Sequence, residues 1–418
     1  MQERERTKAK LILAVGVAMF AIGQSLLFVV VAPLTRMVGL SEVQFGWAFT
    51  LANITFFIGA AYWGRKSDQV GRKRVFVIGM TGATAGILLM ALSLQAGLAG
   101  LASGWGMFAL LALSRAVYGS LASAIYPVAT AYMADVTERS QRAQGMAVIG
   151  GANSLGSILG PALGGGLAFM GILFPLYVAV GLAFLGCVWA MLFLREPEKH
   201  RAPEQRVPLK FTDPRVYPYL IMWGCFFLVF IALQFITAFY IQDQFGISEM
   251  DQVVRIASMA LLVMAVVITL LQGVLFQLVA LSPRLLLRLC APAFTGGILI
   301  LGFAPSVPLF VSGFAMIGVA FSCASPGISG SASLAVAAHE QGVLAGYIGA
   351  ASTLGAMGAP LFGTSIYQLA PNAPMLGGMA IFVVLSLYAL TIPASYGDTE
   401  EPDLVAVPPS PERGGATD

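Results

Sequence analysis

Charged residues are scarce in this sequence. Only 10% of its 418 residues are Asp, Glu, Lys or Arg, whereas a soluble domain carries roughly 25%. In their place, 58% of the residues are hydrophobic. This composition excludes an ordinary soluble domain and indicates a chain that lies largely within a membrane.

The residue types that carry most metal and enzyme chemistry are also few. The two histidines, His200 and His339, form no metal-binding constellation, and the four cysteines lie in apolar segments at no metal-like spacing. The sequence has no phosphate-binding P-loop, which argues against ATP-driven transport by this chain. We therefore expect no enzyme activity, no cofactor, no metal and no nucleic-acid partner.

Long apolar segments dominate the chain instead. A helix needs about 20 apolar residues to cross a hydrocarbon core of ~30 Å, and a segment without water must satisfy its own backbone hydrogen bonds. The sequence therefore predicts an all-α membrane protein with twelve transmembrane helices. The expected spans are 11–35, 43–63, 75–97, 104–134, 143–170, 172–194, 216–242, 252–281, 285–304, 306–337, 342–370 and 375–396.

The positive charges indicate the orientation of these spans. All but three of the 23 Lys and Arg residues lie in alternate connections, the exceptions being Arg36, Arg115 and Arg255. Because cytoplasmic connections carry the excess of Lys and Arg, we expect both termini in the cytoplasm. The basic connections are suited to contacts with anionic membrane lipids.

An internal repeat indicates two halves. The longest polar connection, 195–215, predicts a cytoplasmic linker between six-helix bundles at 1–194 and 216–396, and the tail 397–418 is expected to be disordered. One constant shift in numbering superimposes two proline-bearing glycine motifs. It aligns Gly156, Pro161 and Gly164 with Gly355, Pro360 and Gly363, and Pro127 with Pro326. Parallel repeats of this kind place the substrate site between the halves near the midplane.

The connection between the second and third spans contains both charged residues and glycines. The spacing of Gly64, Asp68, Gly71 and Arg72 resembles the loop signature of the major facilitator superfamily. Gly64 is expected to permit close helix packing and Gly71 a tight reversal, and Asp68 and Arg72 are expected to exchange hydrogen bonds. The resemblance further implies that Asp135, at the end of the fourth span, pairs with Arg72 in a charge network that controls opening. The simpler alternative is that the cations only fix the topology.

The fifth span narrows the resemblance to one subgroup of the superfamily. Its motif is similar to that of the drug:proton antiporters of this superfamily, which implies export, although Ala147 stands where a glycine is usual. The alternative is that the glycines serve only helix packing, without bearing on transport direction. The expected gating residues of this motif are Gly156, Gly160, Pro161, Gly164 and Gly165.

Arg115, in "LALSRAVYG", is the one charged residue deep in a predicted span. A cation at that depth costs roughly 2.5–3.5 kcal/mol on insertion scales, so it should face a cavity or a partner. It matches the arginine of the superfamily's fourth-span signature, with Tyr118 where a glutamine is common. The resemblance implies a cavity cation that binds substrate or senses proton movement. The alternative is a structural arginine satisfied by backbone carbonyls.

The resemblance also implies that spans 1, 4, 7 and 10 line the substrate cavity. Besides Arg115 and Tyr118, the expected substrate-binding residues are Gln24, Phe28, Phe227, Phe230 and Gln234. None of the 20 acidic residues falls in the middle of a span, although many antiporters of this type carry a membrane-embedded acid. Asp68, Asp135 and Asp243, toward span ends, remain the candidate proton carriers.

The expected function is export of small amphiphilic organic compounds by alternating access, coupled to protons, by a monomer in a bacterial inner (plasma) membrane. One alternative is a facilitator or importer of a small anionic metabolite that uses Arg115 as counter-ion. The other is a membrane sensor or scaffold without transport activity.

Overall fold

The computed structural model describes residues 3–137, 142–197, 209–279, 281–337 and 340–391. Within these ranges every regular element is a helix, which confirms the expected all-α class. The expected tail 397–418 and both histidines lie outside the described residues, as does most of the expected linker 195–215.

Long helices follow one another along the whole described chain. In chain order they are α1 (Glu3–Met37), α2 (Glu42–Val70), α3 (Arg72–Leu98), α4 (Gly104–Ala122), α5 (Ile125–Val136), α6 (Arg142–Leu167), η2 (Ala168–Met170), α7 (Phe174–Phe193), α8 (Tyr217–Phe245), α9 (Met250–Leu270), η3 (Leu271–Leu275), α10 (Phe276–Leu278), α11 (Pro283–Phe303), α12 (Val307–Leu334), α13 (Gln341–Tyr367) and α14 (Ala373–Thr391). Among the described residues, ten helical segments are long and apolar enough to cross a membrane. The expected count of twelve spans stays a prediction.

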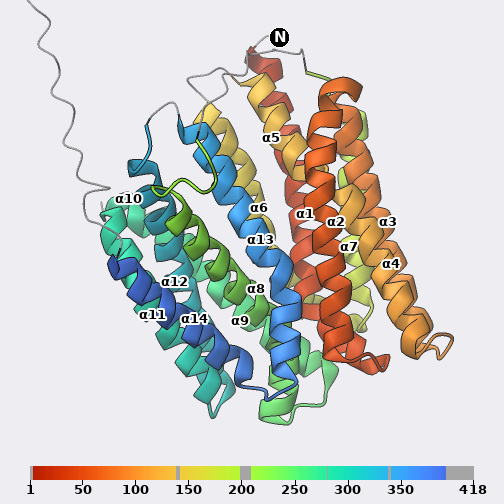
Figure 1. The fold of residues 1–418 in the computed structure, drawn as a ribbon. Helices are drawn as coiled ribbons and strands as arrows, with labels where there is room; N and C mark the ends of the chain where they lie inside the picture. The colour runs from red at the N-terminus through yellow and green to blue at the C-terminus, as the bar shows by residue number, and fades with distance from the viewer. Residues whose placement is uncertain (1–2, 138–141, 198–208, 280, 338–339, 392–418) are drawn as a thin grey trace, which may run out of the picture.

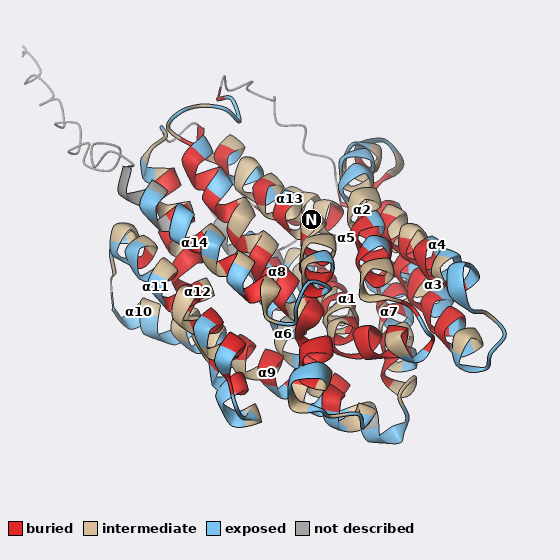
Figure 2. Ribbon diagram, turned by 60° about the horizontal axis from the view of Figure 1, so that its bottom comes forward, coloured by how far each residue is buried: buried red, intermediate tan, exposed pale blue. Residues whose placement is uncertain are grey.

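The helices run between two ends of the molecule (Figure 1). We call the end that carries the start of α1 and the α2–α3 turn the near end, drawn at the top. The far end carries the α1–α2 and α8–α9 connections. Figure 2 shows buried residues on the faces that the helices turn toward one another, and exposed residues on the outer surface and the connections.

The expected fourth span, 104–134, is in fact two helices. Helix α4 ends at Ala122 and α5 begins at Ile125. Pro127 has no N–H, and its ring clashes with the carbonyl of the residue four positions earlier, Ser123, which lies in the break. The expected eighth span, 252–281, is also interrupted, because a π-helical turn at Leu271–Leu275 ends the regular part of α9.

The predicted loop at 64–74 is mostly helical. Helix α2 continues to Val70, α3 begins at Arg72, and only Gly71 separates them. Gly71 has a φ of 114°, a conformation that glycine alone adopts at little cost, so the expected role in the reversal is confirmed. The expected close packing at Gly64 is not found, since a Cβ there would lie 3.8 Å from Pro127, an ordinary contact distance.

The glycine motif of α6 packs mainly on α1. A Cβ at Gly156 would come within 2.3 Å of the Ala21 side chain, and one at Gly160 within 2.8 Å of the Ile22 carbonyl oxygen. The Ser25 hydroxyl donates a hydrogen bond of 2.6 Å to the Gly156 carbonyl. These contacts join two helices of the first half of the sequence, so Gly156 and Gly160 hold α1 against α6.

We expect Gly160→Leu to destabilise the fold rather than to stop a conformational exchange. Its side chain has no space against the α1 backbone, and overpacking costs about 1–3 kcal/mol or more. Thermal unfolding in detergent should show a clearly lowered midpoint. Gly166→Leu, on the same helix with no atom near its Cβ position, is the control and should unfold like the wild type.

Candidate functional site

Arg115 is buried in the fold, with only 6% of its surface exposed. Its guanidinium carbon lies 4.0 Å from the ring centre of Phe49 on α2 and 4.7 Å from that of Tyr118 on α4. The two rings therefore hold the cation by cation–π contacts. Gly119 lets α4 approach α2, since a Cβ there would lie 2.2 Å from the Ala52 carbonyl oxygen.

The hydrogen-bonding capacity of Arg115 and Tyr118 is incompletely used. The Nε of Arg115 and the hydroxyl of Tyr118 are both buried without a hydrogen-bond partner. Among the ion pairs of the described residues, none involves Arg115. A buried polar group that lacks a partner costs about 1–3 kcal/mol, and more if it is charged. The site is thus a cation that an entering anionic or hydrogen-bond-accepting group would stabilise.

Aromatic rings connect Arg115 to the interface between the first and second halves of the sequence. The Phe49 ring lies 5.1 Å from Phe235 of α8, and Phe235 lies 5.3 Å from Phe28 of α1. Phe45 packs on both Phe49 and Phe235, at 4.6 and 5.5 Å. Below Arg115, toward the far end, helices α1, α2 and α8 therefore meet through rings.

The structure brings together only part of the predicted substrate-binding set. Phe28 joins the ring cluster beside Arg115 and Tyr118, whereas Phe227 and Phe230 pack into a second cluster with Phe321 of α12, at 6.1 and 4.8 Å. The remaining two predicted residues are Gln24, which is half-buried, and Gln234, whose side chain donates to the Phe230 carbonyl of its own helix.

An apolar groove opens in the half of the molecule nearer the near end. It encloses about 460 Å³ and is lined by residues of α2, α5 and α13, namely Phe56, Phe57, Ala60, Ala61, Tyr126, Pro127, Thr130, Gly349, Ala350 and Thr353. Tyr126 rests on Phe20 at 5.6 Å, and Phe20 stacks on Tyr118 at 6.4 Å. The wall of the groove is thus connected to the Arg115 site through rings.

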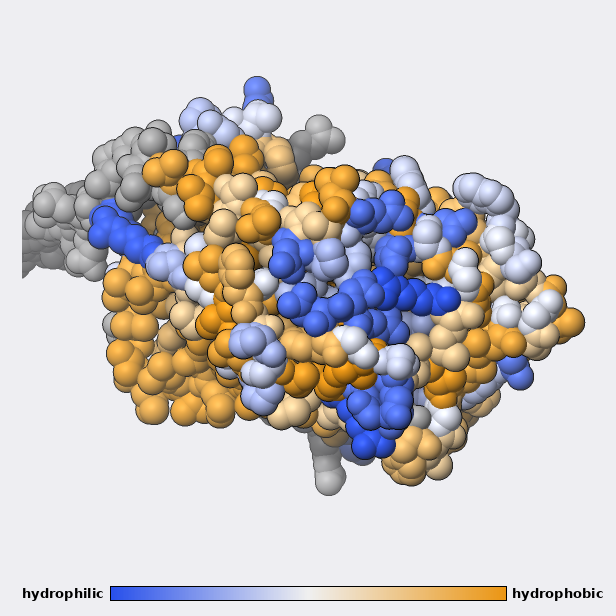
Figure 3. Space-filling view, turned by 90° about the horizontal axis from the view of Figure 1, so that it is seen from below, coloured by the Kyte–Doolittle hydropathy of each residue, from blue (hydrophilic) through white to orange (hydrophobic). Residues whose placement is uncertain are grey.

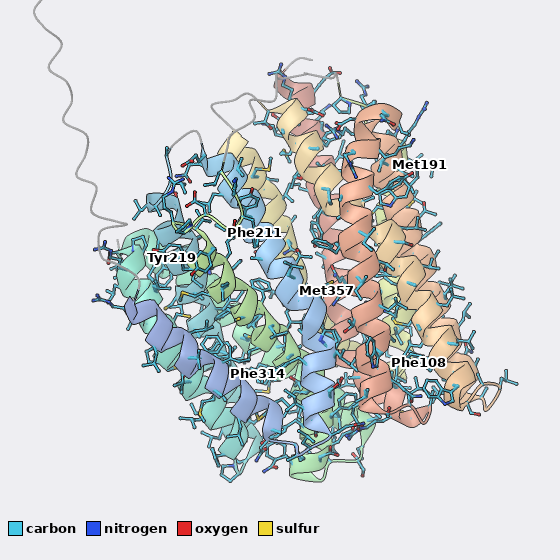
Figure 4. All side chains as sticks on the ribbon, in the orientation of Figure 1. Phe108, Met191, Phe211, Tyr219, Phe314 and Met357 are labelled. Atoms are coloured by element: carbon cyan, nitrogen blue, oxygen red, sulfur yellow. The ribbon has the colours of Figure 1, made fainter. Side chains whose placement is uncertain are left out.

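The same two helices, α2 and α13, are closed toward the far end. A Cβ at Gly46 would lie 3.0 Å from the Pro360 carbonyl oxygen, and the Asn53 amide donates a hydrogen bond of 3.0 Å to the Ala356 carbonyl. Met357 of α13 lies beside α2 at this level (Figure 4). About two turns further, Ala60 and Gly349 face the groove instead of each other. We call the antiparallel contact between α2 and α13 the seam. The seam is therefore closed toward the far end and open toward the near end.

A similar contact joins α6 to α9 at the far end. A Cβ at Gly165 would lie 2.6 Å from the Ser258 side chain, whereas one at Gly164 would lie 3.7 Å from it, an ordinary distance. Pro161 is buried inside α6, which continues through it without a break. Of the predicted gating glycines in this helix, Gly165 is the one that tightly contacts a helix of the second half of the sequence.

At the near end, Arg72 forms the predicted charge network. Its guanidinium pairs with Asp68 at 2.6 Å and with Asp135 at 3.0 Å, which confirms both expected partners. Its backbone N–H and that of Lys73 donate to the Glu196 carboxylate, which caps the start of α3. The network ties α2, α3, α5 and the chain after α7 together.

A second near-end network, absent from the sequence predictions, involves Arg215 before α8. Its guanidinium donates to Asp213 at 2.9 Å and to Glu340, which precedes α13, at 3.2 Å. The hydrogen bonds from Arg215 hold the pKa of the Asp213 carboxyl below its ordinary value, because they favour the ionised form. The starts of α8 and α13 are joined by this pair.

Two residues at the far end form a contact that the sequence does not predict. The sequence marks Arg36 only as a cation outside the basic connections, and Asp243 only as a candidate proton carrier. The structure pairs them at 2.8 Å across the interface between α1 and α8. The one sequence signal was that Arg36 departs from the charge pattern, and nothing along the chain connects it to a residue 207 positions later.

Residues 13–360 match the sequence profile of the Major Facilitator Superfamily. The chain belongs to this family. As a member, it is 26% identical over 385 residues to Multidrug resistance protein 2 of Bacillus subtilis (strain 168), covering 88% of this chain and 90% of the relative. This agrees with the resemblance to drug exporters that the motifs carry.

Solved structures of transporters share the fold. A bacterial homologue of the human lysosomal transporter Spinster, inward-facing and occupied, has a TM-score of 0.68 at 15% identity, covering 93% of this chain and 97% of that one. The human organic anion transporter MFSD10 (TETRAN) has a TM-score of 0.65 at 19% identity, covering 93% and 100%. This superfamily member is thus an integral, multi-pass membrane transporter, and its relatives are transporters rather than enzymes.

Proposed function

We propose that this transporter exports small amphiphilic organic compounds in exchange for protons, as a monomer in a bacterial inner (plasma) membrane. The observation that carries the proposal is the α2–α13 seam, which is closed at the far end and open as an apolar groove toward the near end, with Arg115 buried beside it. A substrate that enters such a groove would meet apolar walls first and a cation at depth.

The distribution of charge supports an orientation in which the groove faces the cytoplasm. Arg65, Lys66 and Arg72–Arg74 lie at the near end, as do Arg195, Lys210 and Arg215. The positive-inside rule would put this end in the cytoplasm. The groove would then be loaded from the cytoplasm or the inner leaflet, and the far end would open to release the substrate.

The chemistry of the groove supports an amphiphilic substrate. Its lining is apolar apart from the hydroxyls of Tyr126, Thr130 and Thr353, while Arg115 and Tyr118 offer unpartnered polar atoms further in. An elongated molecule with an apolar body and a polar group that accepts hydrogen bonds fits this arrangement. The name of the Bacillus relative, a multidrug resistance protein, is consistent with organic cargo.

A second candidate function is facilitated transport or import of a small anionic metabolite. The buried guanidinium of Arg115 favours it, since the described residues give that cation no carboxylate partner and such a cation lowers the cost of bringing an anion to that depth. The fold shared with an organic anion transporter is compatible with this alternative.

Flux into proteoliposomes decides between these functions. A panel of a lipophilic fluorescent cation, an amphiphilic organic anion and its neutral analogue should be tested with and without an imposed pH gradient. Gradient-driven accumulation of amphiphiles supports the exporter. Anion flux that ignores the gradient supports the facilitator, and no flux of any probe supports the sensor or scaffold.

We expect Asp68→Asn and Arg72→Ala to lower flux about tenfold while expression and thermal stability stay near wild type. The network biases the two conformations, and coupling energies of this kind are about 1–3 kcal/mol. Arg65→Ala is the matched control, because Arg65 lies in the same segment but its Nε donates only to the Ala61 carbonyl of its own helix. Wild-type flux in both network variants would remove the gating role.

A further inference from the structure

The far end carries an ion-pair cluster that bridges the two halves of the sequence. Arg36, at the end of α1, donates from its Nη1 and Nη2 atoms to the two carboxylate oxygens of Asp243 on α8, each at 2.8 Å. Its Nη1 also donates to Gln242 at 3.0 Å, and its Nε donates to Glu42 of α2 at 2.8 Å. A bidentate pair with two further acceptors uses the planar fork of arginine fully.

A fourth helix completes the cluster. The hydroxyl of Tyr367, at the end of α13, donates a hydrogen bond of 2.6 Å to Asp243. Among the described residues, Arg36 and Tyr367 are the charged and titratable groups that contact Asp243, and Glu42 contacts Arg36 from the other side. Helices α1 and α2 of the first half are fastened here to α8 and α13 of the second half, at the far-end limit of the seam.

The cluster is partly shielded from water. The side chains of Arg36 and Asp243 keep 24% and 35% of their surface exposed, so their attraction is less screened than that of a surface pair. The guanidinium of Arg36 also lies 4.7 Å over the ring of Phe239. Phe239 packs on Phe45 at 5.6 Å, which joins the cluster to the rings beneath Arg115.

The surface of the far end is consistent with closure of this end by polar residues. Viewed from this end, hydrophilic residues gather over the middle of the face and hydrophobic ones surround them (Figure 3). A basin of about 430 Å³ lined by Arg36, Gln242 and Gly246, among others, lies on this face. Water therefore reaches one side of the cluster.

We propose that Arg36, Asp243 and Tyr367 form a far-end latch that holds the transporter in the state open toward the near end. The inference rests on the proposed alternating access and adds the residues that stabilise one of its two states. When the latch is broken, the halves separate at the far end, and the seam closes where Ala60 and Gly349 now line the groove. Glu42, at the start of α2, keeps the guanidinium of Arg36 oriented toward α8.

Hydrogen–deuterium exchange of the full-length protein in lipid nanodiscs tests the latch without any substrate. Asp243→Asn and Arg36→Gln are expected to speed exchange about tenfold in the segments around 34–42 and 239–247. They are also expected to slow exchange around 56–61 and 346–353, where the groove closes. Tyr367→Phe should shift both regions in the same directions by a smaller factor.

A matched ion pair at the same end provides the control. Arg255 and Asp251 pair at 3.2 Å within α9 alone, so Arg255→Gln removes a far-end salt bridge that joins no two helices. It should leave both regions as in the wild type. The double variant Arg36→Asp with Asp243→Arg should restore at least part of the wild-type exchange, because it returns an opposite-charge pair to the interface.

Opposite changes of exchange in the two regions distinguish a latch from an ion pair that only stabilises its own surroundings. Faster exchange at the far end without protection of the groove segments would mean local fraying and would overturn the proposal. So would unchanged exchange in both Asp243→Asn and Arg36→Gln. If the reciprocal shift occurs but no probe of the flux panel is transported, the latch stands and the proposed cargo fails. If flux is driven by the pH gradient while exchange ignores these variants, the exporter stands and the latch fails.

Discussion

Arg115→Ala is expected to lower flux by a factor on the order of 100 or more. Truncating one partner of a buried, desolvated charge interaction costs about 2–5 kcal/mol, and each 1.4 kcal/mol is tenfold. The guanidinium of Arg115 lies over the rings of Phe49 and Tyr118, and its buried Nε has no hydrogen-bond partner among the described residues. Initial rates in proteoliposomes, and the thermal shift that a transported probe produces, measure the loss.

Arg115→Lys should retain part of the activity, because lysine keeps the charge but lacks the planar fork that stacks on rings. If the substrate is anionic, wild type should prefer it to a neutral analogue and Arg115→Ala should lose that preference. Arg255→Ala, an exposed far-end arginine, is the control. An alanine variant with normal flux and normal preference would leave Arg115 as a packing residue.

Two glycine substitutions on the α2–α13 seam are expected to stop transport in opposite states. Gly46→Leu has no space in the closed far-end part, where a Cβ would lie 2.1 Å from the Thr364 hydroxyl, so it should force the far end open. Gly349→Leu meets nothing within 4 Å in the present state, but it would fill the groove on which the near end has to close. Each should lower flux at least about 100-fold, since closure of a packed seam tolerates no extra side chain.

Accessibility labelling from each side of the membrane separates the two blocks. Gly46→Leu should be labelled mainly from the far-end side, and Gly349→Leu only from the near-end side. Gly181→Leu in α7, also without a neighbour within 4 Å and outside the groove, controls for adding a leucine to a membrane helix. Substrate-dependent labelling that stays as in the wild type in both variants would show that the seam does not move.

The glycine motif of α6 shows what local spacing can and cannot predict. The motif alone places Gly160 and Pro161 among the expected gating residues. The structure shows Gly160 against α1 of its own half, whereas Gly165 contacts Ser258 of α9. The glycine pattern predicts close helix approach, but it does not tell which helix approaches, because that depends on the rotation of α6 about its axis.

The sequence by itself determined the membrane class, the helical fold and the family resemblance, because these follow from length, hydropathy and local spacing. It also identified the Arg72 network, whose first partner, Asp68, is four residues away in the sequence and whose second, Asp135, follows from the family resemblance. Arg115 stood out because a charge deep in an apolar segment has a cost that demands a reason.

Only the tertiary structure decided what those residues face. In a soluble helix the apolar stripe marks the buried side, but a membrane helix is apolar all around, so its period does not separate lipid-facing from inward-facing positions. The placement of Phe49 under Arg115, the seam that pairs Asn53 with Ala356, and the contact of Arg36 with Asp243 therefore had no signal along the chain. They arise from the tilt and rotation of whole helices, which are set by packing between segments that are distant in the sequence.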